Sequence, residues 1–233
     1  MRDRLAILLM IAAVAPSCVE AQSQPGASPH TGSLIAAPPA ASVNGTTKTD
    51  ARRAALAFSQ CVLKRMPLIG AGILTDPVGT EQYTTLVSKA ASSECLEGGV
   101  ILHMPQILMR AAFFEAAYIQ QFRTGPVELK DSPIVDYRAG YSDSLNPYVA
   151  NTIALAQFGD CVVRAGTSDA RAMVLNLPGS YSENRAVAAL IPKLAPCVPA
   201  GSKVEFSKPV LRGAIAEAIY RLSVASTQNK ASN

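Results

Sequence analysis

Residues 211–220 have the sequence LRGAIAEAIY, and residues 109–118 have the sequence MRAAFFEAAY. Arg, Ala, Glu, Ala and Tyr recur at the same places in both stretches, 102 positions apart. Apolar residues at spacings of three and four surround the charged pair, a pattern typical of a helix that is buried on most sides. The two stretches therefore predict two equivalent helices, each the central helix of its own part of the chain.

A second pair of matching stretches lies upstream, at residues 54–64 and 154–164, with an offset of 100. Ala54, Phe58, Cys61 and Val62 match Ala154, Phe158, Cys161 and Val162. Cys95 and Cys197 continue the correspondence at the later offset of 102. An internal duplication explains both sets of matches, and it predicts two helical units at residues 51–123 and 150–226.

The expected fold is all-α, with three helices in each duplicated unit. The helices are predicted at residues 51–66, 79–95 and 105–122, and again at 148–165, 181–195 and 208–225. Asp50 is the expected N-cap of the first helix, Asn146 before Pro147 marks the start of the fourth, and Ser180 with Glu183 fits a capping box.

Three further segments complete the predicted organisation. Residues 124–149 contain Pro, Gly, Asp, Ser and three Tyr, so they are expected to connect the two units across the surface. Residues 22–50 are rich in Pro, Ser, Gly and Ala and have few large apolar groups, which predicts a disordered tether. Residues 227–233 are expected to form a disordered tail.

The N-terminus has the pattern of an export signal. Two arginines precede the apolar run Leu5–Ala15, and small residues at 19 and 21 predict cleavage before Gln22. Residues 1–21 are therefore expected to be a signal peptide, and the mature protein periplasmic or secreted. The alternative is cleavage before Cys18, which would then carry a lipid and anchor the protein to the envelope.

Four cysteines remain in the two predicted units. They are Cys61, Cys95, Cys161 and Cys197. An exported chain is expected to oxidise them, and four cysteines allow three connectivities. Locality and duplication favour one disulfide inside each unit, each worth about 3.8 kcal/mol in the chain-entropy model. A redox role is disfavoured because the sequence has no C-x-x-C motif.

The repeated phrase places polar residues on helices that are otherwise apolar. These candidate residues are Arg110, Glu115, Tyr118, Arg212, Glu217 and Tyr220. Arg and Glu five positions apart lie about 140° apart around a helix, so they cannot pair within one copy. One hypothesis is a ligand site in which Arg binds an anionic group while Glu and Tyr orient it.

The alternative hypothesis is a structural role for these charges. An antiparallel pair of helices about a two-fold axis would join Arg110 to Glu217 and Arg212 to Glu115. The competing structural solution is that each Arg finds a carboxylate or helix-end carbonyls inside its own unit.

Composition and motifs exclude several functional classes. The formal net charge is +4 without a cluster of Lys or Arg, so nucleic-acid binding is not expected. The sequence has no H-E-x-x-H, G-x-S-x-G, P-loop or dinucleotide-binding motif, and His103 is the only histidine in the predicted units. No catalytic residue, metal or cofactor is predicted.

We therefore expect an exported, non-enzymatic binding or accessory protein of the cell envelope. Its partner would be an envelope protein or a small ligand, and it would meet the membrane only through a lipid on Cys18. The alternative is a cell-wall or small-molecule hydrolase with unrecognised carboxylate chemistry. A polar cleft with a close Asp/Glu pair would favour the hydrolase, whereas an apolar surface groove would favour the binding protein.

The arrangement Cys…Cys…L-R-G-x-x-A-E-x-x-Y resembles a group of exported alphaproteobacterial proteins with no known activity. The resemblance is carried by Cys161, Cys197, Leu211, Arg212, Gly213, Ala216, Glu217 and Tyr220. The first copy keeps both cysteines, the Arg, the Glu and the Tyr but has Ala111 in place of the Gly. The resemblance implies export and an α-helical fold, and it implies no activity.

Overall fold

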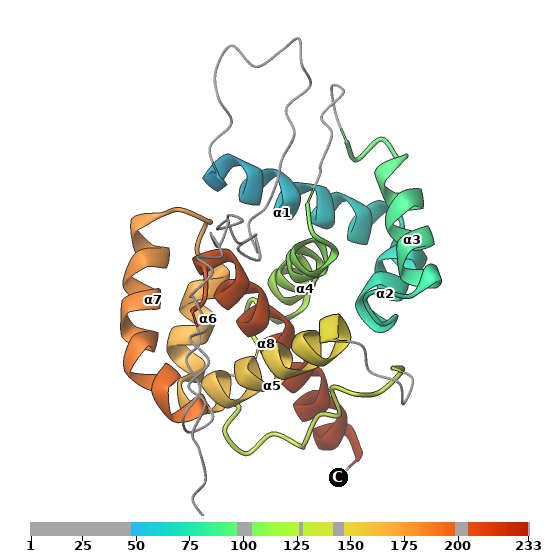
Figure 1. Cartoon of the computed structure of the whole chain (residues 1–233). Helices are drawn as coiled ribbons and strands as arrows, with labels where there is room; N and C mark the ends of the chain where they lie inside the picture. The colour runs from blue at the N-terminus through green and yellow to red at the C-terminus, as the bar shows by residue number, and fades with distance from the viewer. Residues whose placement is uncertain (1–47, 97–103, 126–127, 142–146, 199–204, 233) are drawn as a thin grey trace, which may run out of the picture. The chain divides into compact units, whose positions relative to one another are not determined.

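A computed structural model describes residues 48–96, 104–125, 128–141, 147–198 and 205–232. These residues form eight α-helices and one short 3₁₀ helix, and none of them lies in a strand. The helices are α1 (Lys48–Arg65), α2 (Pro67–Thr75), α3 (Glu81–Ala91), α4 (Gln106–Phe122), α5 (Pro147–Ala165), α6 (Thr167–Leu175), α7 (Tyr181–Leu194), η2 (Ala195–Cys197) and α8 (Lys208–Ser232). The all-α fold class is confirmed (Figure 1).

The helices form two series of the same order, α1–α4 and α5–α8. Each series has one helix more than the three that were expected, because α2 and α6 follow the first helix of their series almost directly. Pro67 starts α2 at a position where a missing backbone N–H costs nothing, and it prevents α1 from continuing. Met66 is the N-cap of α2, and Gly166 is the N-cap at the corresponding place before α6.

Several predicted boundaries can be compared with the described helices. Asp50 lies inside the first turn of α1 and is not its N-cap, since the described helix already begins at Lys48. Pro147 begins α5 as predicted, and Asn146 lies outside the described residues. The helix α8 continues to Ser232, so residues 227–232 are helical where a tail was expected. The predicted signal peptide at 1–21 also lies outside the described residues.

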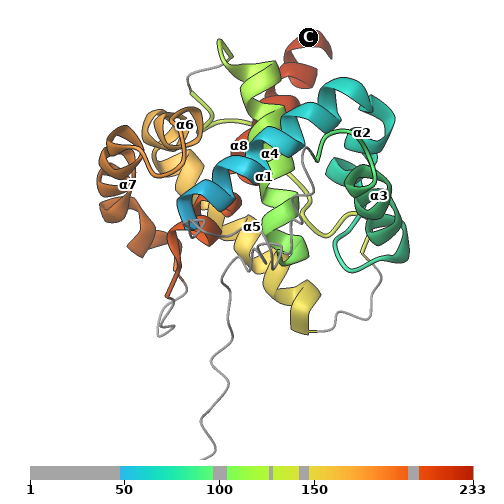
Figure 2. The same ribbon diagram turned by 90° about the horizontal axis from the view of Figure 1, so that it is seen from above.

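The helices α4 and α8 share the most extensive interhelical contact of the described chain, and α1 and α5 pack against them from outside. The expectation that they are the central helices is therefore confirmed. The expected antiparallel arrangement is wrong, because α4 is seen almost along its axis in Figure 1 while α8 runs diagonally past it, and Figure 2 shows the same crossing from above. They cross at Ala111 and Gly213, where a Cβ on the glycine would lie 2.6 Å from the Ala111 Cβ.

Each series is held together by one disulfide. Cys61 of α1 is bonded to Cys95, just after α3, with 5.6 Å between their Cα atoms. Cys161 of α5 is bonded to Cys197 at the end of η2, with a Cα separation of 5.7 Å. Both predicted pairings are confirmed, and such disulfides are typical of proteins outside the reducing cytosol.

The segment between the two series does more than cross the surface. Leu129 is fully buried in the main core, and Tyr137 forms a small second core with Ile153 and Ala156. The Tyr137 hydroxyl also donates a hydrogen bond to the Asp160 carboxylate, 2.9 Å away. These contacts fix the segment against α5. No helix in the described part of the chain is long and apolar enough to cross a bilayer.

Candidate functional site

Arg212 of α8 is the centre of a buried charge network. Its Nε and Nη2 atoms donate to the two carboxylate oxygens of Glu115 on α4, at 2.8 and 2.6 Å. Its Nη1 atom donates to Glu183 of α7 at 3.1 Å. All three residues are buried, so their charges are held by one another and by hydrogen bonds rather than by water.

Arg110 of α4 makes the reciprocal pair, with 3.6 Å between its Nη2 atom and the Glu217 carboxylate of α8. Both predicted cross-pairs, Arg110 with Glu217 and Arg212 with Glu115, are thus confirmed at distances below 4 Å. Glu217 also pairs with Arg221, one turn later on α8, at 2.9 Å. The Arg110–Glu217 distance is therefore longer than the Arg212–Glu115 distance, and Arg110 shares the Glu217 carboxylate with Arg221.

Each arginine also satisfies the C-terminal carbonyls of the short helix in its own series. Arg110 donates to the carbonyl oxygens of Ile73, Leu74 and Asp76 at the end of α2, at 3.0, 3.3 and 2.5 Å. Arg212 donates to those of Met173, Val174 and Asn176 at the end of α6, the last two at 3.0 and 2.8 Å. The two structural solutions that the sequence presented as competitors therefore occur together, and a cation at a helix C-terminus is favourable.

The two networks differ at two positions, and the sequence analysis identified neither as part of a site. One of them is Glu183. Glu183 accepts hydrogen bonds from Arg52, Arg212 and the Gly179 N–H, while its own N–H donates to the N-cap Ser180. Burial alone would raise the pKa of Glu183, but the Arg52 and Gly179 hydrogen bonds and the two arginine charges lower it overall. Glu183 is therefore ionised and unsuited to act as a general acid.

Residue 83, the position that corresponds to Glu183, is a tyrosine. Arg110 lies against the rings of Tyr83 and Phe114, with 6.0 and 4.9 Å from its guanidinium carbon to the ring centres. Thr152 likewise stands where the first series has Arg52. Arg52 and Glu183 belong to different series, so their ion pair joins the two series. At the two reciprocal positions, Thr152 and Tyr83, both charges are absent together.

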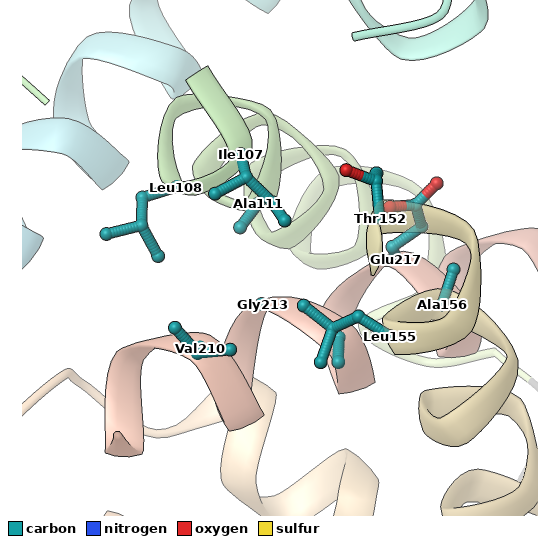
Figure 3. Close-up of a pocket in the computed structure, with 10 residues that line it drawn as sticks. Ile107, Leu108, Ala111, Thr152, Leu155, Ala156, Val210, Gly213 and Glu217 are labelled. Atoms are coloured by element: carbon teal, nitrogen blue, oxygen red, sulfur yellow. The ribbon is translucent and has the colours of Figure 1, made fainter. Parts of the chain in front are cut away.

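Two small cavities lie where α4 and α8 cross. One has a volume of about 20 Å³ and is lined by Ala111, Gly213, Thr152 and Glu217 among others, as Figure 3 shows. The other, of about 30 Å³, lies at the corresponding place beside Glu115 and the two arginines of its network. Cavities of this size hold a single water molecule, not a substrate. This favours the structural interpretation of the repeated Arg and Glu over the ligand-site hypothesis.

The tyrosines of the repeated phrase lie away from these cavities. Tyr118 is fully buried and its hydroxyl accepts a hydrogen bond from Arg171 at 2.8 Å. Tyr220 is partly exposed, and its hydroxyl donates to the Gln121 side chain at 3.4 Å. Neither hydroxyl is bonded to the glutamate of its own helix in the described structure. Tyr220 instead lines the feature that best fits a ligand.

That feature is an open groove with a volume of about 570 Å³, which we call the α2–α8 groove. It lies between α2, the C-terminal halves of α4 and α8, and the connecting segment. Its lining residues are Leu63, Pro67, Ala71, Leu74, Thr75, Phe114, Gln120, Gln121, Ile134, Val135, Ala139, Tyr220, Arg221, Val224, Ala225 and Gln228. The volume lies in the range of small-molecule and peptide sites.

The lining of the α2–α8 groove is mainly apolar. Three glutamines, Thr75 and the Tyr220 hydroxyl supply uncharged polar groups, and Arg221 is the one charged lining residue. Arg221 is already paired with Glu217. Ile134 is 97% exposed in the segment that forms one wall of the groove. The lining has no carboxylate, imidazole or thiol, so it offers apolar contact and hydrogen bonds rather than acid–base chemistry.

The groove could be only partly anticipated from the sequence. Of its residues, Tyr220 alone belonged to the predicted polar cluster. Its walls come from five elements, α1, α2, α4, the connecting segment and α8, and one of them, α2, was not expected as a helix. No periodic pattern marks such a combination. Within the described residues, no group of three or more His, Cys, Asp or Glu side chains could hold a metal ion.

Comparisons with protein-family models, with curated proteins and with solved structures found no match for this chain.

Proposed function

We propose that this chain is an exported, non-enzymatic binding or accessory protein of the cell envelope, and that the α2–α8 groove is its binding surface. The observation that carries the proposal is the open groove of about 570 Å³ with its apolar lining. An apolar groove with a few polar groups is the usual form of a small-molecule site, and this lining has no carboxylate, imidazole or thiol for catalysis. The buried Arg–Glu networks would then serve as the rigid frame behind it.

The hydrolase alternative has less support. Glu115 and Glu183 both contact Arg212, so two carboxylates do lie close together. They are buried and ion-paired, however, and Glu183 is held ionised by its partners. A carboxylate pair for hydrolysis needs one proton donor and access to substrate, and this pair offers neither.

Export and internal duplication belong to the same proposal. The two disulfides and the apolar N-terminal run support an oxidising destination, the periplasm or the exterior. The identical order of helices in the two series supports duplication of one ancestral unit. Intact-mass measurement of envelope material should give a mature chain that begins at Gln22, or at an acylated Cys18. A dominant species that retains Met1 would refute export by either route.

Photo-crosslinking in the envelope tests the binding function. A benzoylphenylalanine at Ile134, in the wall of the groove, should form an adduct with the bound ligand. The matched control is the same group at Leu177, which is 64% exposed but not part of the groove lining. Ala71→Arg, which fills the groove, should abolish the Ile134 adduct. Equal labelling at both positions, or an adduct that survives Ala71→Arg, would refute the groove as the binding surface.

A further inference from the structure

We propose that the α2–α8 groove binds a short peptide segment of a partner protein, with a leucine-like side chain buried in it. The inference rests on the proposed function of the groove and adds the chemistry of its ligand. It comes from a comparison of the two series, since the second series has the same groove in a filled state. The chain itself therefore shows which kind of ligand such a groove accepts.

The corresponding positions identify the second groove. At the offset of 100, Pro67 and Ala71 of the open groove correspond to Thr167 and Arg171 on α6. At the offset of 102, Tyr220 corresponds to Tyr118. Tyr118 is fully buried, whereas Tyr220 is partly exposed. The second set of walls is therefore covered where the first set is open.

The cover is a short stretch of the connecting segment, residues 128–133, which makes a turn closed by a hydrogen bond from the Ser132 N–H to the Leu129 carbonyl at 3.2 Å. Leu129 is fully buried there, and its backbone N–H donates to the Thr167 hydroxyl at 3.3 Å. Arg164 of α5 donates to the carbonyl oxygens of Lys130, Ser132 and Pro133, at 3.0, 2.7 and 2.9 Å. One apolar side chain and several backbone groups thus hold this segment in place. The open groove has Pro67 and Lys64 at the positions of Thr167 and Arg164, so its expected contact with a ligand is mainly the apolar side chain.

Arg171 closes the rest of the second groove. It donates to the Tyr118 hydroxyl and to the carbonyl oxygens of Phe122 and Arg123 at the end of α4. Ala71, its counterpart, is exposed and reaches none of the corresponding atoms. The replacement of a long side chain by a methyl group leaves space in the first groove that the second lacks.

The chain after α8 does not fold back in the way that it does after α4. The segment that fills the second groove begins a few residues after Phe122, where α4 ends. At the corresponding place in the second series, Val224, the helix α8 continues, and it reaches Ser232. Because α8 continues, Val224 and Ala225 form part of the groove wall, and this part of the chain does not cover the groove.

The rim of the open groove suits a peptide backbone. Gln120, Gln121 and Gln228 line it, and a glutamine side chain can both donate to a carbonyl and accept from an N–H. Gln120 also donates to the Gln60 carbonyl at 3.3 Å, and Gln121 accepts from the Tyr220 hydroxyl at 3.4 Å. The choice of a peptide over an acyl chain therefore rests on the comparison with residues 128–133. The single charged lining residue is already paired, so the peptide is expected to be uncharged where it is bound.

The test is fluorescence anisotropy with a labelled peptide and the full-length mature protein, with both disulfides formed. The probe copies residues 128–135 with their charges made neutral, QLQNSPIV, and the control peptide has Ser in place of its Leu. We expect saturable binding of the probe and binding about tenfold or more weaker for the control, as for loss of one buried leucine side chain.

Substitutions in the groove lining test whether the peptide binds there. Ala71→Arg supplies the side chain that closes the second groove, and Ala225→Gln narrows the first groove from α8; each should weaken the probe about tenfold or more. Ala188→Arg, on an exposed position of α7 that is not part of the groove lining, should have no effect. Circular dichroism shows whether each variant is folded. The inference would be overturned if both peptides bound with equal affinity, or if neither Ala71→Arg nor Ala225→Gln changed the affinity for the probe.

A dansylated fatty acid separates failure of this inference from failure of the proposed function. If the fatty acid binds with sensitivity to Ala71→Arg and the peptide does not, the groove is an acyl-chain site and the peptide inference is wrong while the binding function stands. If neither probe shows binding that depends on Ala71, both the inference and the groove as a binding surface are refuted.

Discussion

Substitution of the two central arginines should have unequal effects on stability. Arg212→Met keeps the side-chain length but leaves the buried Glu115 carboxylate without its bidentate partner. Breaking a buried pair in this way costs about 3–5 kcal/mol. Three α6 carbonyls also lose a charged donor, so a total of about 5 kcal/mol is reasonable. That approaches the whole stability of a typical domain, about 5–15 kcal/mol.

Arg110→Met should cost less, about 2–3 kcal/mol. The reason is that Glu217 keeps its 2.9 Å pair with Arg221 and is not left as an isolated buried charge. The loss is then limited to the α2 carbonyl hydrogen bonds and the contacts with two aromatic rings. The two variants should differ by about 2 kcal/mol in the free energy of unfolding.

Urea unfolding followed by circular dichroism, with the disulfides intact, measures both free energies. The double variant Arg212→Met with Glu115→Met removes both charges and should recover most of the loss, since well-packed apolar replacements of a buried pair are often neutral. Arg185→Met on the exposed face of α7 is the control and should change stability by less than about 0.5 kcal/mol. Equal costs for the two arginines, or a double variant as unstable as the sum of its parts, would show that the burial argument is wrong.

Three further predictions concern packing, burial and the disulfides. Gly159→Ala should destabilise the protein by about 1–3 kcal/mol because its Cβ would collide with the Ala214 backbone, whereas Gly72→Ala meets only the end of a leucine side chain and should be nearly neutral; urea midpoints decide between these and equal effects. Burial, the largest cause, raises the pKa of Tyr83 and of Tyr137, so the folded chain should hold these protons above about pH 10 and lose stability as pH rises further. Tyrosinate absorbance should show their ionisation later in the folded than in the urea-unfolded protein, and coincident titrations would contradict this. Serine in place of both cysteines of either disulfide should lower the free energy of unfolding by about 3.8 kcal/mol, and a loss below about 1 kcal/mol would contradict the loop-entropy argument.

Features that depend on local spacing could be predicted from the sequence. The cysteines 34 and 36 residues apart had their partners within one unit, and both pairings were found. The Arg and Glu of the repeated phrase could not pair within one helix, so their reciprocal pairing across α4 and α8 followed from helix geometry. The predicted duplication supplied the remaining constraint, because it led us to expect the Arg–Glu pair of the repeated phrase in two copies.

Features without such a constraint were missed. The nine-residue helices α2 and α6 are too short to carry a clear period, and each begins directly after the helix before it. The steep crossing of the central helices depends on the close approach of Ala111 and Gly213, which spacing alone does not reveal. Glu183 was identified only as part of a capping box, because its role in the Arg212 network has no counterpart at Tyr83.

On the proposed duplication, the places where the two series differ are more informative than those where they agree. The central Arg–Glu pairs cannot change one residue at a time, because each single change leaves a buried charge at a cost of several kcal/mol. The exchange of Arg52 and Glu183 for Thr152 and Tyr83 follows this rule, since both charges differ together.

The groove positions are not bound by that rule. Ala71 is exposed, so the difference between it and Arg171 has little effect on the core, yet it decides whether a groove is open or closed. We propose that one series became a closed scaffold, filled by the segment that joins the two, and that the other kept an open groove. If the groove were only a packing defect, filling it by Ala71→Arg would stabilise the protein and change nothing else. If it is a binding site, the same substitution removes ligand binding, and this difference separates the two explanations in a single variant.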